Sequence, residues 1–156
     1  MASPSYPATF QATVSHRDAT RPLQRSMRII GALAILAMGA LHLQQYLDAE
    51  YQAIPTIGTL FVLNFAGAVV IGLVLLAPTE RISERLGNRA VGLAAVLGAG
   101  MAATSIAFLL ISEQTPLFGF MEDGYRTPIV VALISEAVAV LALAGYLVSA
   151  LAAGRR

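Results

Sequence analysis

Four long apolar stretches constrain the fold of this chain more than any other feature. Each stretch reaches the roughly 20 residues that a helix needs to cross a hydrocarbon core of about 30 Å. Backbone groups in lipid must be satisfied within the segment, and the stretches are too long for barrel strands and lack their alternation, so they are helices. We therefore predict an all-α bundle of four transmembrane helices, covering approximately residues 27–47, 57–77, 90–112 and 128–151.

The composition agrees with a membrane protein. Of the 156 residues, 57% are hydrophobic and only 12% are charged, whereas soluble domains are typically about 25% charged. The net charge of +1 is too balanced for a nucleic-acid partner, and the basic residues lie outside the apolar stretches or at their edges. The chain has no cysteine, which excludes disulfides, thiolate metal sites and iron–sulfur clusters within it.

The arginines predict the orientation in the membrane, because arginines in short loops are retained on the cytoplasmic side. Nine of the ten basic residues fall on one side of the four stretches, and the loops on the other side hold mainly acidic residues and Arg126. We expect both termini in the cytoplasm and a multi-pass protein of the bacterial inner membrane. The nine are Arg17, Arg21, Arg25, Arg28, Arg81, Arg85, Arg89, Arg155 and Arg156.

The segments outside the bundle are short. Residues 1–26 are rich in Ser, Thr and Pro and lack a continuous apolar face, which predicts a flexible cytoplasmic tail. A cleaved signal peptide is not expected, because the charged lead is long and no small-residue cleavage site follows residue 47. The membrane domain then spans residues 27–151, and residues 152–156 form a basic cytoplasmic tail.

Polar residues occur at one depth in all four predicted helices. With about 1.5 Å of rise per residue, they lie roughly 7 to 13 Å below the outer surface. The cytoplasmic halves of the same helices are almost free of strongly polar side chains. We predict a ligand-binding polar pocket that opens outward, lined by His42, Asn64, Thr104, Ser105, Ser135 and Glu136.

Glu136 is the centre of this prediction, because a carboxyl group within a membrane helix is costly and usually marks a site or pathway. The structural alternative is a protonated acid that donates a hydrogen bond to Asn64 or to a backbone carbonyl. The other polar residues have the alternative of interhelical hydrogen bonds. A pair of His42 and Glu136 suits proton binding, but even with Met38 it offers too few ligands for a metal. We expect no metal, no cofactor and no catalytic residue.

The second outer loop, residues 113–127, combines aromatic, acidic and glycine residues. This mixture suits a lid over the polar layer or a docking surface. The alternative is a loop whose Phe and Tyr side chains lie among the lipid headgroups. The candidate loop residues are Glu122, Asp123, Tyr125 and Arg126.

Two strings of residues resemble a pattern from small, uncharacterised bacterial four-helix membrane proteins. The resemblance covers approximately residues 27–150 and implies the four-helix architecture. More distantly, the chain is similar to the DoxX-like group, some members of which are linked to redox enzymes as accessory subunits. The strings are His42-Leu43-x-x-Tyr46 with Ile54-Pro55-Thr56-Ile57-Gly58-x-Leu60-Phe61-x-Leu63-Asn64, and Gly119-Phe120-x-Glu122-x-Gly124 with the Glu136 segment.

Three classes of function remain open from the sequence. The first is a non-enzymatic accessory or binding protein that recognises a small cation, a proton or a polar ligand. The second is a proton- or cation-coupled transporter or channel subunit, which needs a homo-oligomer because four helices make a small pore. The third is a redox or quinone-associated subunit, with His42 and the loop aromatics at its site. The expected partners are the lipid bilayer and either another membrane protein or a second copy of the chain.

Overall fold

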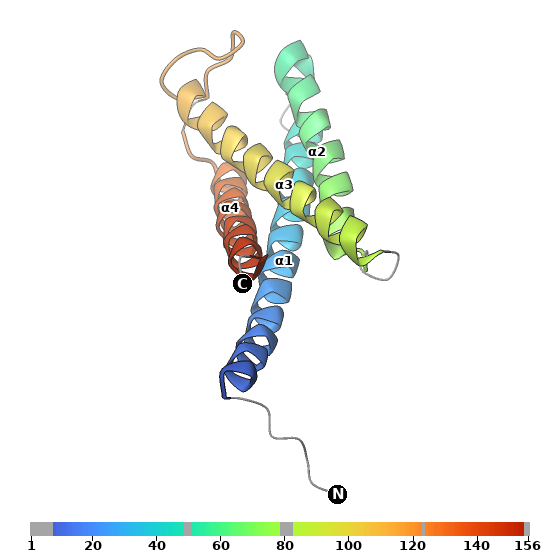
Figure 1. Ribbon diagram of the computed structural model, residues 1–156. Coiled ribbons are helices and arrows are strands. Elements are labelled where there is room, and N and C mark those ends of the chain that lie inside the picture. The colour runs from blue at the N-terminus through green and yellow to red at the C-terminus, as the bar shows by residue number, and fades with distance from the viewer. Residues whose placement is uncertain (1–7, 49–50, 79–82, 123, 155–156) are drawn as a thin grey trace, which may run out of the picture.

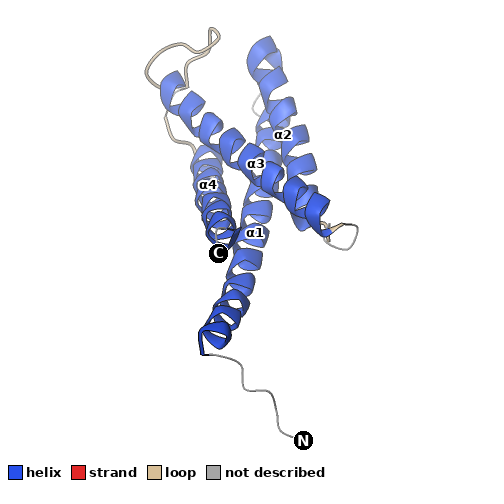
Figure 2. Cartoon of the chain, in the orientation of Figure 1, coloured by secondary structure: helices blue, strands red, loops and turns tan. Residues whose placement is uncertain are grey.

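The computed structural model is all-helical, and four of its helices are long and apolar enough to cross a membrane. It describes residues 8–48, 51–78, 83–122 and 124–154. The predicted all-α, four-helix class is confirmed (Figures 1 and 2). The elements are α1 (Ala8–Asp48), the single 3₁₀ turn η1 (Tyr51–Ala53), α2 (Pro55–Leu76), α3 (Glu84–Ser112) and α4 (Thr127–Gly154).

The ends of α2 and α4 lie within three residues of the predicted ends, and α3 begins earlier than expected. Pro55 is the first residue of α2. An N–H at that position has no acceptor within the helix, so a proline there costs no hydrogen bond. Ser83 precedes α3, and its hydroxyl oxygen accepts a hydrogen bond of 3.4 Å from the N–H of Leu86. Because this cap starts α3 at Glu84, Arg85 lies in the first turn of the helix rather than in a loop.

The start of α1 differs from the expected flexible tail. Residues 8–26 are helical and continuous with the rest of α1, although Pro22 lies among them. A helix that extends an existing one needs no new nucleus, so a segment without an apolar face can remain helical. Figure 1 shows this part of α1 projecting past the ends of the other helices. Residues 1–7 of the expected tail, and the last two residues of the chain, lie outside the described residues.

The four helices pack in the ring order α1, α2, α3, α4. Helix α1 packs extensively against α2 and α4, and α3 packs against α4 and less extensively against α2. Successive helices run in opposite directions, so η1 and the loop between α3 and α4 lie at one end of the bundle (Figure 1). The extension of α1 lies at the other end.

Small residues let the helices approach closely, as expected of membrane bundles. A Cβ atom on Gly39 of α1 would lie 2.5 Å from the Cβ atom of Ala68 on α2, so glycine is needed at this crossing. Ala94, Gly98 and Ala102, the predicted packing stripe of α3, are all buried. The large side chains that fill the centre are Ile35, Met38, Leu75, Val91 and Leu143.

The outer surface of the bundle is strongly apolar. Large side chains such as Leu141, which is 74% exposed, and Val148 point away from the other helices. On a soluble protein an exposed apolar surface of this extent would be unusual. In a protein whose four helices cross the membrane, this is the surface that would contact the lipid bilayer.

Candidate functional site

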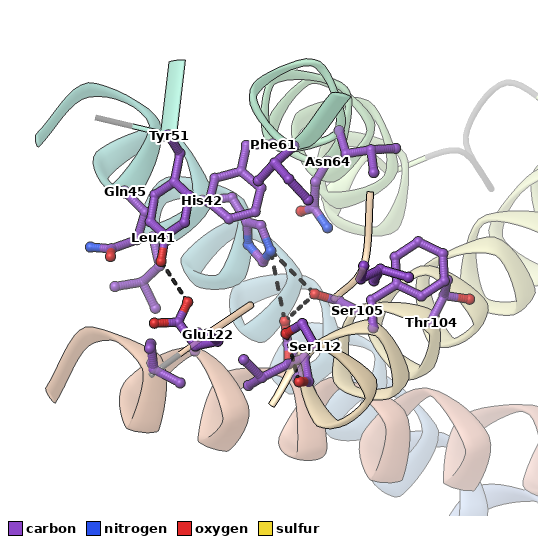
Figure 3. Close-up of a pocket in the computed structure, with 18 of the residues that line it drawn as sticks. Leu41, His42, Gln45, Tyr51, Phe61, Asn64, Thr104, Ser105, Ser112 and Glu122 are labelled. Carbon is purple, nitrogen blue, oxygen red and sulfur yellow. Dashed lines mark hydrogen bonds and ion pairs between the residues drawn. The ribbon is translucent and has the colours of Figure 1, made fainter. Parts of the chain in front are cut away.

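A cavity of about 390 Å³ lies at the end of the bundle where η1 and the α3–α4 loop meet. All four helices contribute to its lining, and the loop contributes Leu117, Phe120 and Glu122 (Figure 3). Most of the lining side chains are apolar, so the predicted polar layer forms only part of the wall. The predicted site residues that line the cavity are His42, Asn64, Thr104, Ser105, Glu122 and Glu136.

Three of these residues form a hydrogen-bonded chain across α1, α3 and α4. Glu136 is only 2% exposed, and its Oε1 accepts a hydrogen bond from Ser105 Oγ. Ser105 Oγ also lies 3.2 Å from His42 Nε2. His42 Nε2 and Glu136 Oε1 are 3.9 Å apart, which is too far for a direct hydrogen bond, so Ser105 joins them (Figure 3).

The number of protons in this chain follows from its geometry. His42 Nδ1 lies 2.9 Å from the carbonyl oxygen of Met38, which can only accept, so Nδ1 carries a proton. The two contacts of Ser105 need two protons between them, and its hydroxyl supplies only one. The second proton sits either on the carboxyl of Glu136 or on Nε2 of His42. In the first arrangement Glu136 donates to Ser105 and Ser105 donates to His42; in the second, His42 donates to Ser105 and Ser105 donates to Glu136. In both arrangements the His42–Glu136 pair has no net charge.

Aromatic rings form the wall of the cavity beside this chain. The ring of Phe61 on α2 lies with its centroid 5.0 Å from that of His42, in an edge contact. The ring centroid of Tyr51 lies 4.9 Å from that of Phe61, and the ring centroid of Phe120 in the loop lies 5.3 Å from that of Tyr51. This row connects His42 on α1 with the loop that covers the cavity.

A second polar cluster fixes that loop to η1. The hydroxyl of Tyr51 donates to Glu122 Oε2 at 2.6 Å and accepts from Arg126 Nη2 at 2.7 Å. Arg126 also donates to Glu122 Oε1 at 3.1 Å, which closes a triangle of three side chains. Burial and the hydrogen bond to Glu122 raise the pKa of Tyr51 to about 12, and the Tyr51 and Glu122 contacts raise the pKa of Arg126. Tyr51 therefore stays neutral over the physiological range.

Two amide oxygens at the cavity have no hydrogen-bond partner. Oδ1 of Asn64 on α2 and Oε1 of Gln45 on α1 are both buried, and both residues line the cavity. The polar layer offered His42, Asn64, Thr104 and Ser105 as partners of Glu136, and Ser105 is the one that bonds to it. An unsatisfied buried acceptor costs about 1–3 kcal/mol. A hydrogen-bond donor that reached either oxygen would remove this cost.

The remaining predicted residues that the structure describes do not take part in these clusters. Thr104 lines the cavity but is exposed, and Ser135 instead donates to the carbonyl oxygen of Val131 at 2.9 Å. Thr104 precedes Ser105, and Ser135 precedes Glu136. Because adjacent residues of a helix point about 100° apart, each points away from its neighbour in the hydrogen-bonded chain. Tyr125 donates to Glu113 at 2.6 Å on the exposed side of the loop, and Asp123 lies outside the described residues.

Several lining residues were not predicted. Gln45 lies three residues after His42, and Ser112 lies seven after Ser105, so helical spacing places each on the face of a predicted residue. That spacing could have identified both. Tyr51, Phe61 and Phe120 come together only because η1 and the loop fold over the end of the bundle, which helical spacing does not reveal.

The described ranges contain no group of three or more His, Cys, Asp or Glu side chains placed to hold a metal ion. The side chains at the cavity offer hydrogen bonding, proton exchange between Glu136, Ser105 and His42, and apolar contact. Comparison of the sequence and the fold with protein-family models, with curated proteins and with solved structures finds no match.

Proposed function

We propose that the protein binds a small molecule in this cavity and acts as a non-enzymatic accessory or binding subunit of the bacterial inner membrane. One observation carries the proposal: two residues that line the cavity, Asn64 and Gln45, each have a buried oxygen acceptor without a partner, beside a satisfied chain of Ser105, His42 and Glu136. Its volume of about 390 Å³ lies within the roughly 300–1,000 Å³ typical of small-molecule sites. A ligand that donates hydrogen bonds would remove the penalty of the unpaired acceptors.

The arginine distribution supports an orientation with both termini in the cytoplasm. The cavity lies beside η1 and the loop that carries Glu122, opposite the end from which α1 projects. In this orientation the ligand reaches the cavity from the outer half of the membrane.

The packing of the other half favours a binding site over a conduit. On the cytoplasmic side of the cavity, Ile35 of α1, Leu75 of α2 and Leu143 of α4 are fully buried. They belong to one apolar core between these helices. The buried side chains of this core are apolar, and Tyr146 packs against it as a partly buried residue with a hydroxyl. A pocket closed at its inner end suits a protein that holds a ligand for a partner. The resemblance to DoxX-like proteins suggests a membrane protein as that partner.

The test is whether small molecules remain bound during purification from the membrane. We expect mass spectrometry of the purified protein to detect a retained molecule in the wild type that is reduced in Glu136→Gln and absent in Glu136→Ala. Ser135→Ala is the matched control, because Ser135 is adjacent on α4 and bonds only to its own helix. Adding the identified molecule back should raise the melting temperature of the wild type and of Ser135→Ala.

Two results would contradict the proposed binding function. If both Glu136 variants retained the molecule and melted like the wild type, the cavity would not be its binding site. If no molecule were retained by any protein, and none of the fractions extracted from the membrane raised the wild-type melting temperature, the binding function would be rejected.

A further inference from the structure

The exposed residues among those that line the cavity all lie on α2 and α3. The two helices cross where Gly67 faces Met101, at 3.1 Å from a Cβ atom built on the glycine, and where Gly98 faces Ile71, also at 3.1 Å. Beyond this crossing, toward η1 and the loop, the two helices diverge (Figure 1). Met101 at this crossing and residues of both helices beyond it line the cavity.

The side chains of α2 and α3 that flank the gap between the two helices are exposed, although they also line the cavity. Leu63 on α2 is 60% exposed, and Phe108 on α3 is 37% exposed. Thr104, one turn before Phe108, is also exposed. Leu63 lies eight residues into α2, or about 12 Å from its start at about 1.5 Å per residue. At that depth in a spanning helix, the neighbouring medium is the hydrocarbon of the bilayer.

Polar and apolar groups are separated within the cavity. The polar lining includes the Glu136–Ser105–His42 chain and Asn64, which follows the exposed Leu63 on α2. The surfaces between them and the gap include Leu63, Met101 and Phe108. The His42–Glu136 pair is neutral in either proton arrangement, and Glu122 is paired with Arg126. No unbalanced charge is left at the described lining to attract an ionic headgroup.

We propose that the ligand is an uncharged amphiphile that enters from the bilayer between α2 and α3. Its headgroup donates a hydrogen bond to Asn64 Oδ1, and its apolar body lies along Leu63, Met101 and Phe108. This inference rests on the proposed binding function and specifies its ligand class and entry route. A long-chain alcohol carries the minimum set of these features, namely one hydroxyl donor and an alkyl chain.

Tryptophan fluorescence tests the entry route directly, because the chain contains no tryptophan of its own. Phe61→Trp places a reporter in the wall of the cavity, and Leu141→Trp places one on the exposed lipid-facing side of α4. In vesicles of phosphatidylcholine brominated in its acyl chains, we expect both reporters to be quenched. Dodecanol should then restore the emission of Phe61→Trp by displacing brominated chains, and should leave Leu141→Trp quenched.

Two comparisons test the headgroup. Dodecane, which has the same chain but no donor, should restore much less emission than dodecanol at equal membrane concentration. Adding Asn64→Leu to Phe61→Trp should abolish the difference between the two compounds. Equal effects of dodecanol and dodecane in the Phe61→Trp protein would overturn the assignment of the headgroup to Asn64.

The route is overturned if Phe61→Trp is not quenched while Leu141→Trp is. In that case, retention of a purified molecule that depends on Glu136 would still support the binding function, so the two proposals fail separately. Phe120→Trp provides a second reporter, because Phe120 lines the cavity from the loop and does not contact His42 in the aromatic row. It is used if circular dichroism shows that Phe61→Trp is misfolded, and the same pattern of quenching and recovery is required of it.

Discussion

His42 Nε2 lies 3.9 Å from Glu136 Oε1, and the two groups share a hydrogen-bonded chain without bonding to each other directly. The hydroxyl of Ser105 connects them, and the Met38 carbonyl fixes the other side of the imidazole ring. A shift of two protons along this chain exchanges a neutral pair for an ion pair with the same total charge. An acid and a base can therefore be kept in a membrane helix bundle without a net charge.

This geometry predicts the tautomer of His42. Nδ1 should be protonated whether the ring is neutral or charged, because the Met38 carbonyl oxygen can only accept. Nitrogen NMR of the labelled imidazole measures this directly in a His16→Gln background, which leaves His42 as the one remaining histidine. Ser105→Thr retains the hydroxyl and should preserve the signal, whereas Ser105→Ala should change the Nε2 shift. A neutral ring with its proton on Nε2 would contradict the proposed chain.

Asn64→Leu should make the ligand-free protein more stable and weaken ligand binding. The substitution removes a buried oxygen without a partner, which costs about 1–3 kcal/mol, and replaces it with a side chain of similar size. The free energy of unfolding in detergent micelles should rise, and dodecanol should no longer raise the melting temperature. Thr104→Val is the control, because Thr104 is exposed and both changes should be smaller there. A less stable Asn64→Leu protein would indicate that Asn64 has a partner within the bundle.

Tyr51 should ionise late in an alkaline titration, near pH 12. Burial and the hydrogen bond to Glu122 raise its pKa from 10.0 to about 12 in the folded protein. The folded state therefore holds this proton more tightly than the unfolded state. The resulting stabilisation is complete below pH 10 and is lost as the pH rises through about 12.

The ultraviolet absorbance of tyrosinate measures this ionisation. Of the five tyrosines, Tyr51→Phe should remove the component that titrates near pH 12. It should also flatten the decline of the unfolding free energy above pH 10. Tyr125→Phe is the control, because Tyr125 lies on the exposed side of the loop and its loss should leave the latest component in place. If the component near pH 12 were undiminished in Tyr51→Phe, the triangle with Glu122 and Arg126 would not exist in solution.

The sequence was sufficient for features that depend on length and helical periodicity. Apolar length predicted the four helices, and the four-residue repeat of Ala94, Gly98 and Ala102 predicted a buried face. Burial of Glu136 followed from the cost of a carboxyl group in lipid. Depth alone was a weaker guide, because it placed Ser135 with Glu136 although adjacent residues point in different directions around a helix. The rotation of each helix, and hence the choice of Ser105 over Asn64 as the partner of Glu136, depends on packing between helices.

Gly39 should be among the positions most sensitive to the addition of a single methyl group. In Gly39→Ala the new Cβ would lie 2.5 Å from the Cβ of Ala68, which is fully buried and has no rotamer with which to move away. Overpacking of this kind typically costs about 1–3 kcal/mol, because α1 and α2 must separate. Equilibrium unfolding in micelles, followed by circular dichroism, should show this loss.

The matched control for Gly39→Ala is Gly100→Ala on α3, where a Cβ meets nothing within 4 Å. That variant should be neutral or more stable by up to about 1 kcal/mol, since alanine is the better helix former. Combining Gly39→Ala with Ala68→Gly moves the methyl group to the other helix and should recover most of the lost stability, as a double-mutant cycle measures for residues in contact. Additive losses in the cycle would mean that Gly39 and Ala68 do not meet, and that the α1–α2 crossing lies elsewhere along these helices.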